Sequence, residues 1–435
     1  MLQYLVLEGS VFVSPKLFKM IKDNELTKDQ VGKDIIAGII VAIIALPLSI
    51  ALAISSGVSP EKGLITAIFA GFVISLLGGS KVQIGGPTGA FVVIVYGVVK
   101  TYGITGLITS TMMAGIILVV MGLLRFGSLI KYVPQTITVG FTSGIAVTLL
   151  TTQLKDFFGF KIADVPAEFI GKVESYIQNI STFDIASFLI GLSCILILVY
   201  WPKVNKKIPA SIIALIVSTL AVNLLNLPTD TIGTRFSEIS SSIPKPQTPH
   251  MDVKTIINLI KPALTIALLG AIESLLSCVV SDNMIDDKHD SNMELVAQGL
   301  GNIASSLFGG IPATGAIART AANVKNGGRS PISGMVHAIT LLLIMVILMP
   351  FAKLIPMTTL AAILIIVSYN MGEWSHFKEL LSSSKSDVLV LLITFTFTVV
   401  FDLVFAIGVG MAVHYVFKFI KSRQEKDEEE ELEAA

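Results

Sequence analysis

Two stretches of this sequence share an unusual pattern: SLLGGSKVQIGGPTGAF at residues 75–91 and SLFGGIPATGAIART at residues 306–320. Each begins with Ser-Leu, one further residue and Gly-Gly, and each then reaches Thr-Gly-Ala, at 88–90 and at 314–316. Glycine and proline interrupt regular helices. Two copies in matching positions therefore indicate an internal repeat in which each half contains a broken element.

The remainder of the chain is very apolar. Of its 435 residues 53% are hydrophobic and only 14% are charged, and the mean hydropathy is +0.80. Runs near or above the roughly 20 residues that span a bilayer occur repeatedly. They lie at 35–56, 104–124, 183–201, 262–280, 332–352 and 386–420. The sequence predicts an all-helical protein that crosses the lipid bilayer many times.

Charge and chemistry-bearing residues exclude several classes of function. The 31 basic and 31 acidic residues balance, so no nucleic-acid partner is expected. The two cysteines, Cys194 and Cys278, lie in apolar segments and resemble buried small hydrophobes rather than a disulfide. The five histidines form no metal-ligand pattern, and GGPTG at 85–89 lacks the Lys-Ser/Thr ending of a phosphate loop. We expect no enzyme, no metal site and no organic cofactor.

A count of the apolar segments gives about fourteen spans, seven in each half. The first seven are expected near 34–56, 62–78, 87–100, 104–125, 134–152, 183–201 and 208–226. The second seven are expected near 262–280, 292–308, 315–325, 332–352, 356–370, 386–400 and 402–420. An odd number of spans in each half means that the halves are inserted with opposite orientation, the inverted-repeat plan of secondary transporters.

This count divides the chain into five parts. They are a cytoplasmic N-terminal segment (1–33), a first membrane repeat (34–226), an external loop (227–261), a second repeat (262–420) and an acidic cytoplasmic tail (421–435). Lysine and arginine gather in the segments that lie inside if the N-terminus is inside, for example Lys203, Lys206 and Lys207. Both termini are therefore expected to be cytoplasmic.

The segments 87–100 and 315–325 are too short to cross alone, and each follows one of the two opening motifs. We expect an extended stretch and then a half-helix at each place. Pro87 and Pro312 suit such starts, because proline is well tolerated in the first helical turn. Two converging helix N-termini offer free N–H groups and positive dipole ends to an anion. The alternative is that the glycines only permit close helix packing.

Two charged residues stand out within the apolar segments. Arg319 comes four residues after Gly315, about one turn into the second half-helix, and such a deep guanidinium is a functional candidate. Alternatively it extends to the cytoplasmic face with Lys325 and Arg329. Asp34, by contrast, sits at the end of a span and needs no special role.

Glu273 lies in LTIALLGAIESLLSCVVSD (264–282), with Ser274 and Ser277 nearby. It could exchange a proton, pair with Arg319, or coordinate a cation together with the serine oxygens. The structural alternative is a charge that locks two helices together. Asp402, between the last two spans, is expected to stabilise a bend or an interface rather than to touch substrate.

Six ordered blocks resemble the sulfate permease (SulP) family over about residues 30–420. They are ALPLSIALAISSGVSPEKGL (45–64), GGPTGAF (85–91), YVPQTITVGFTSGIAVTLLTTQLKDFFG (132–159), GAIESLLSCVVSD (270–282), ELVAQGLGNIASSLFGGIPATGAIARTAANVKNGGRSPISG (294–334) and FDLVFAIGVG (401–410). The resemblance implies a fourteen-helix fold with a core domain (spans 1–4 and 8–11) and a gate domain (spans 5–7 and 12–14). It also implies anion binding between the starts of spans 3 and 10, and a homodimer. Within the family the chain looks most like bacterial members, including proton-coupled dicarboxylate carriers and cyanobacterial bicarbonate transporters, which implies a bacterial inner (plasma) membrane.

Carried over by position, the resemblance assigns substrate-binding and coupling residues. The substrate-binding residues are Thr88, Gly89 and Ala90 on the first half-helix, and Gly315, Ala316, Ile317, Ala318 and Arg319 on the second. Glu273, with Ser277, falls on the acidic coupling-ion position of span 8. Proton-coupled members have a glutamate there and the sodium-coupled bicarbonate carrier an aspartate, so protons are favoured over sodium.

Three features depart from the family pattern. The Pro-Gln pattern of span 1 is Pro47-Leu48 here, with Leu52 where an aromatic is usual, so sulfate is less favoured. The position before the arginine, often serine, is Ala318. Where a STAS domain usually follows the last span, this sequence continues with KSRQEKDEEEELEAA (421–435), which is expected to be too short and polar to fold alone, either as a natural short form or as part of a longer chain.

Together these features predict a secondary active carrier of small anions. The expected substrate is sulfate, a dicarboxylate or bicarbonate, moved with protons by elevator-type alternating access. Sodium-coupled or exchange-type transport, and a nucleobase carrier of the same fold, are the alternatives. An anion channel or a structural membrane scaffold would be a different class of protein.

Overall fold

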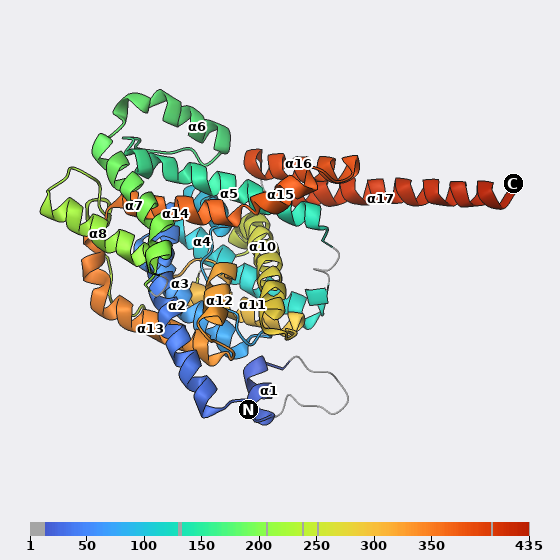
Figure 1. Ribbon diagram of the computed structural model, residues 1–435, viewed down its shortest axis with the longest axis horizontal. Helices are drawn as coiled ribbons and strands as arrows, with labels where there is room; N and C mark the ends of the chain where they lie inside the picture. The colour runs from blue at the N-terminus through green and yellow to red at the C-terminus, as the bar shows by residue number, and fades with distance from the viewer. Residues whose placement is uncertain are drawn as a thin grey trace.

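The computed structural model describes residues 14–128, 133–205, 208–236, 239–249, 252–401 and 403–434, and these residues are mostly helical (Figure 1). The first-half helices are α1 (Lys16–Lys22), α2 (Lys28–Ser55), α3 (Pro60–Leu77), α4 (Phe91–Leu123), α5 (Gln135–Phe158), α6 (Phe169–Gln178), α7 (Ile185–Val204), α8 (Ala210–Leu224) and α9 (Ile232–Arg235). The second-half helices are α10 (Val253–Ile285), α11 (Ser291–Leu307), α12 (Ile317–Lys325), α13 (Ile332–Leu348), α14 (Met357–Met371), α15 (Trp374–Leu380), α16 (Lys385–Val400) and α17 (Leu403–Ala434). Short 3₁₀ turns lie at Ile180–Thr182 and Met349–Leu354.

The apolar composition is arranged as a membrane protein requires. Within the described residues, seven helical segments are long and apolar enough to cross a bilayer: α2, α3, α4, α5, α7, α10, and α13 together with the turn after it. On α7, a stripe of aliphatic side chains faces outward at helical spacing: Ile185, Leu189, Leu192, Leu196 and Val199. An outer surface of this kind is stable in lipid and not in water. The prediction of a polytopic helical membrane protein is confirmed.

The helices fall into two groups by their packing. Helices α2, α3, α4, α10, α11, α12 and α13 pack mainly with one another, and α5, α7, α8, α14, α16 and α17 do the same. Between the groups, α14 and α8 contact α2, and α5 contacts α4 to a smaller extent. The molecule therefore consists of two bundles joined by a limited interface.

Two short strands join the halves of the chain. Strand β1 (Gly85–Gly86) pairs antiparallel with β2 (Thr314–Gly315), with Gly85 opposite Gly315. The extended stretches predicted before both short helices are confirmed. Helix α12 has only 9 residues. Helix α4 contains the expected break between two spans as a kink at Gly103, where φ is +68°.

Two predicted boundaries differ most from the structure, the start of α10 and the end of α17. Helix α10 begins at Val253 and not at 262, because the Asp252 side chain caps it by accepting from the Thr255 N–H (3.2 Å); the loop expected at 227–261 is correspondingly shorter. Helix α17 continues to Ala434, through the tail that was expected not to fold, and projects from the bundle (Figure 1). The tail is rich in glutamate, lysine and alanine, which favour helix, and it extends a helix that already exists. Asp402 lies outside the described residues.

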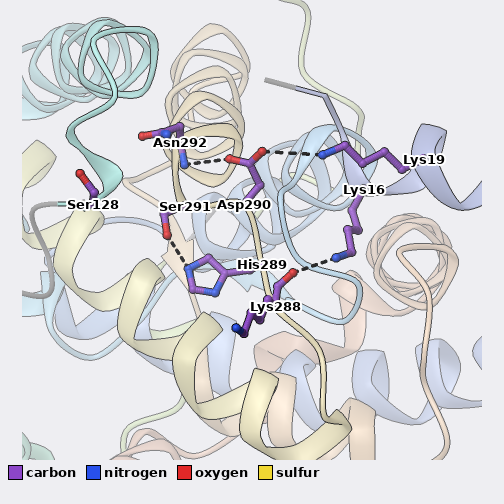
Figure 2. Close-up of a pocket in the computed structure, with 8 residues that line it drawn as sticks. All are labelled: Lys16, Lys19, Ser128, Lys288, His289, Asp290, Ser291 and Asn292. Carbon is purple, nitrogen blue, oxygen red and sulfur yellow. Dashed lines mark hydrogen bonds and ion pairs between the residues drawn. The ribbon is translucent and has the colours of Figure 1, made fainter. Parts of the chain in front are cut away.

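The N-terminal helix α1 binds to the first bundle through a hydrogen bond and an ion pair. The Lys16 N–H donates to the Gly78 carbonyl (2.9 Å), and the Lys16 ammonium lies 3.0 Å from an Asp287 carboxylate oxygen. Lys19 lies 3.8 Å from Asp290, and both line a cavity of about 410 Å³ that Figure 2 shows with its lining residues. Since Gly78 ends α3, α1 connects the loops at one end of this bundle.

Candidate functional site

The pairing of β1 with β2 places the starts of α4 and α12 beside each other inside the first bundle. The Ala316 N–H donates to the Ile84 carbonyl (2.9 Å), and the Ile84 N–H donates to the Thr320 hydroxyl (3.0 Å). Among the described residues, no side chain caps the start of either helix, at Ala90 or at Ala316. At the start of α4 the Phe91 and Val92 N–H groups donate to the Thr88 (3.3 Å) and Gly89 (3.2 Å) carbonyls. Among the described residues, the first-turn amides of α12 are therefore the ones that remain available to a ligand.

Arg319 is the largest fully buried side chain of the described residues, with 1% of its surface exposed. Its Nη2 donates to the Pro87 carbonyl (2.9 Å) and lies 3.4 Å from the Ser49 hydroxyl, while Nε and Nη1 have no partner. No carboxylate among the described residues lies within 4.0 Å of the guanidinium. The structure thus excludes both extension to the surface and pairing with Glu273. A buried, unneutralised cation is costly and is stabilised by an anion.

Glycine at 86 is required by this arrangement. A side-chain carbon at Gly86 would overlap Nη1 of Arg319, and the backbone there has φ +158°. The second strand has a parallel feature, because a side-chain carbon at Gly315 would overlap the amide of Gln83. Each strand glycine therefore accommodates a long polar side chain that lies across it.

Glu273 contacts the start of the other half-helix. Its Oε2 accepts a hydrogen bond from the Thr88 hydroxyl (2.8 Å), and both side chains keep partial exposure. The two serines near Glu273 in sequence do not join it. Ser274 turns toward Gln83 and Glu294, and the Ser277 hydroxyl is buried with no partner among the described residues. A cation site made of Glu273 and these serine hydroxyls is therefore not assembled.

The remaining predicted residues surround this centre. Gly89, Ala90, Gly315 and Ala316 are buried, whereas Ile317 is 41% exposed and Ala318 is exposed. Ala318 borders a crevice of about 320 Å³ between α2 and α12 on one side and α7, α8 and α14 on the other. Its walls are mostly aliphatic, with side chains such as Ile40, Ile44, Leu48, Ile363 and Ile366. The site thus lies beside the interface of the two bundles.

Sequence reasoning missed several residues that shape the site. The Asn302 amide accepts from the Ala313 N–H (2.9 Å) and donates to the Ala313 carbonyl (2.8 Å), which holds the chain just before β2. Glu294 is fully buried and bonds to Gln83 (3.1 Å). The signal for Glu294 was a carboxylate inside the expected span 292–308. An acid near a helix start is readily interpreted as a cap, because carboxylates are common in the first helical turn.

Asp34 corrects another expectation. It was assigned no special role, yet it is fully buried and binds the loop before α13. Its carboxylate accepts from the Arg329 N–H (2.7 Å) and from the Ser330 hydroxyl (2.6 Å). Asp34 therefore fixes the start of α2 to a loop almost 300 residues later.

Comparisons with known proteins agree with this architecture. The model of the sulfate permease family matches residues 31–394. YvdB of Bacillus subtilis (strain 168) is 45% identical over 360 residues, 82% of this chain and 68% of that protein. The bicarbonate transporter BicA of a Picosynechococcus species is 32% identical over 378 residues, 85% of this chain and 66% of that protein. The chain thus spans about two thirds of the length of these relatives.

Solved structures give the same result. The transmembrane domain of a cyanobacterial BicA superposes with a TM-score of 0.80 at 31% identity, covering 88% of this chain and 98% of that one. SLC26A9 superposes with a TM-score of 0.86 at 20% identity, covering 94% of this chain and 68% of that one, which supports the fold alone. The relatives are transporters and not enzymes. This chain belongs to the sulfate permease family of membrane anion transporters.

Proposed function

We propose that this protein is a secondary active transporter that binds one small anion between the first turns of α4 and α12. The observation that carries the proposal is Arg319, a fully buried guanidinium with two unpartnered nitrogen atoms and no carboxylate within ion-pair distance among the described residues. A bound anion would neutralise this charge and accept from the backbone amides in the first turn of α12. Thr88, just before α4, is partly exposed, and Ile317, in the first turn of α12, is 41% exposed.

For the coupling ion we propose a proton carried by Glu273. Its contact with the Thr88 hydroxyl links the carboxyl group to the anion site, so that proton binding and anion binding affect one another. The isolation of Ser277 argues against a sodium site at Glu273. Sodium coupling and anion exchange are the alternatives, and each would leave uptake independent of a proton gradient.

The substrates we propose are sulfate, a small dicarboxylate or bicarbonate. Sulfate is suggested by the description of the family, and bicarbonate by the name of the relative BicA. The aliphatic walls of the crevice beside Ala318 favour an anion with an organic portion. A nucleobase substrate is disfavoured because carriers of nucleobases use carboxylates to bind the base, whereas Arg319 is a cation.

For the mechanism we propose an elevator in which the first bundle is the core and the second is the gate. Counting α4 as two spans about Gly103, the helices α2, α3, α4, α5, α7 and α8 supply seven segments. Helices α10, α11, α12, α13, α14, α16 and α17 supply the other seven, as an inverted repeat requires. The limited interface between the bundles supports movement of one against the other. A homodimer in a bacterial plasma membrane, with both termini cytoplasmic, completes the proposal.

Uptake into proteoliposomes tests the proposal. Labelled sulfate, succinate and bicarbonate are offered with and without an inward proton gradient, to the wild type and to the Arg319→Ala and Glu273→Gln variants. We expect one anion to accumulate only with the gradient, no uptake by Arg319→Ala, and uptake by Glu273→Gln that ignores the gradient. Unchanged uptake by both variants would show that the site is elsewhere. Uptake that follows voltage, saturates poorly and carries no protons would indicate a channel.

A further inference from the structure

Glu294 is a buried carboxylate with four hydrogen-bond donors around its two oxygens. It lies in the first turn of α11 with none of its surface exposed. Its oxygens accept from the Gly79 N–H (2.9 Å), the Gln83 amide (3.1 Å) and the Gln298 amide (2.8 Å), and the Ser274 hydroxyl lies at 3.4 Å. No lysine, arginine or histidine of the described residues lies within 4.0 Å. Four donors around two oxygens match the acceptor capacity of a carboxyl group.

This carboxylate fixes the side chain of Gln83. The Gln83 amide nitrogen donates to Glu294 and also lies within hydrogen-bond distance of the Ser274 carbonyl (3.1 Å) and hydroxyl (2.9 Å). All of its donor capacity is directed to these neighbours, so the amide has one orientation. The Gln83 side chain is buried, with 4% of its surface exposed. Any movement of its amide would therefore break hydrogen bonds with the three partner atoms.

Gln83 in turn lies across the start of the second half-helix. A side-chain carbon at Gly315 would overlap its amide nitrogen, so the two groups are in direct contact. Gly315 belongs to β2 and precedes Ala316, at which α12 begins. The position of the Gln83 amide therefore limits where the first amides of α12 point.

The same carboxylate also connects the other elements of the site. Through Gly79 it holds the loop that leads into β1, and glycine is needed there because a side-chain carbon would overlap the Asp290 carbonyl. Through Ser274 it contacts α10 directly beside Glu273. One buried carboxyl group thus joins the approach to β1, the start of α12 and the helix that carries Glu273.

We propose that Glu294 is a positioning residue for the anion site, acting through Gln83 on the first turn of α12. This inference rests on the proposed function, because it assigns Glu294 to the geometry of the same site. Glu294 touches no substrate. It holds the free amides and Arg319 in the orientation that receives the anion. The competing explanation is that Glu294 only stabilises the bundle, and the experiment separates the two.

The test measures KM, maximal rate and melting temperature for anion uptake by Glu294→Gln, Gln83→Ala and the double variant. A glutamine at 294 would direct an amide NH₂ toward donors that need an acceptor. We expect each single variant to raise KM about tenfold with a maximal rate within about twofold of the wild type. The double variant should be no worse than either single one, because residues that act in one chain of contacts are not additive.

The matched control is Thr359→Val, which removes a buried hydrogen bond to the Ser218 hydroxyl (2.7 Å) in the second bundle. It should lower the melting temperature and leave KM unchanged. If KM rises equally in the control, the rise results from a general loss of stability and not from the position of Gln83, and the inference is overturned.

Two further outcomes are decisive. If Glu294→Gln does not fold, Gln83→Ala alone tests the inference, and a folded Gln83→Ala protein with wild-type KM overturns it. Additive effects in the double variant would also overturn it, because Glu294 would then not act through Gln83. A wild type that takes up no anion would instead overturn the proposed function, which is a distinguishable result.

Discussion

Gly86 lies against the guanidinium of Arg319, so closely that a single side-chain carbon at position 86 would overlap Nη1. The two residues come from opposite halves of the chain and meet where β1 pairs with β2. The position of the buried Arg319 guanidinium therefore depends on the absence of a side chain at residue 86, more than 200 positions earlier in the chain.

The first prediction follows from this contact. Gly86→Ala should displace the Arg319 guanidinium and reduce anion affinity between about tenfold and a hundredfold. Gly97→Ala is the matched control, because nothing lies within 4 Å of a side-chain carbon at that position. Isothermal titration of the purified proteins with the transported anion measures both. Equal affinities for the two variants would contradict the expected effect.

The second prediction concerns stability. Asp34→Asn removes one acceptor of a carboxylate that binds Arg329 and Ser330, and should destabilise the protein by about 2 kcal/mol. The measurement is the melting temperature in detergent. Asp29→Asn serves as the control, since the Asp29 side chain is 78% exposed and its ion pair with Lys33 contributes little. A melting temperature lowered equally by both variants would count against the assigned role of Asp34.

The third prediction is a pH dependence that originates in α6, outside the membrane spans. Burial, and then the nearby positive charge of Lys100, lower the pKa of Lys172 to about 8. In the unfolded chain the pKa is near its ordinary value of about 10.4. Between these values the unfolded state binds more protons, so this residue makes the protein more stable as pH rises from about 8 to about 10.

Lys172→Met tests this dependence, because methionine fills similar space without a charge. As the pH rises from 7.5 to 10, the melting temperature of the wild type should increase relative to that of the variant. The difference between the two curves isolates Lys172 from every other titrating group. A constant difference across this range would contradict the assignment.

The fourth prediction concerns access to the site. Ala318 is exposed and borders the crevice, whereas Ala90 is buried. A cysteine introduced by Ala318→Cys should react quickly with a polar thiol reagent, and one introduced by Ala90→Cys slowly. Both native cysteines are buried and give a low background. Similar labelling rates at both positions would show that the crevice does not reach the start of α12.

The sequence predicts the helices and their interruptions well, because these depend on local properties. Apolar runs set the spans, and Gly103 marks the break within α4, where a residue without a side chain adopts positive φ. The repeated Thr-Gly-Ala motifs also indicated that two short helices begin at equivalent places. The start of α10 was missed because a polar cap, Asp252, allows a helix to continue beyond its apolar part.

The partners of buried polar residues could not be predicted. Arg319 was identified as a candidate, yet its contact with the Pro87 carbonyl depends on how two distant segments pack. Gln83 and Glu294 are 211 positions apart, and neither has an unusual local sequence. Only the three-dimensional arrangement shows that an amide and a carboxylate so far apart form one unit.

The two-residue pairing of β1 with β2 has a consequence for biogenesis. Gly85 is synthesised 230 residues before its partner Gly315, which at about 5–20 residues per second corresponds to roughly 12–46 s. During this interval the backbone of β1 has no strand partner, although unpaired backbone groups are costly within a bilayer. The backbone N–H and C=O groups of β1 must therefore bind other partners, such as water or the insertion machinery, until the second half of the chain has been inserted and β2 can pair with them.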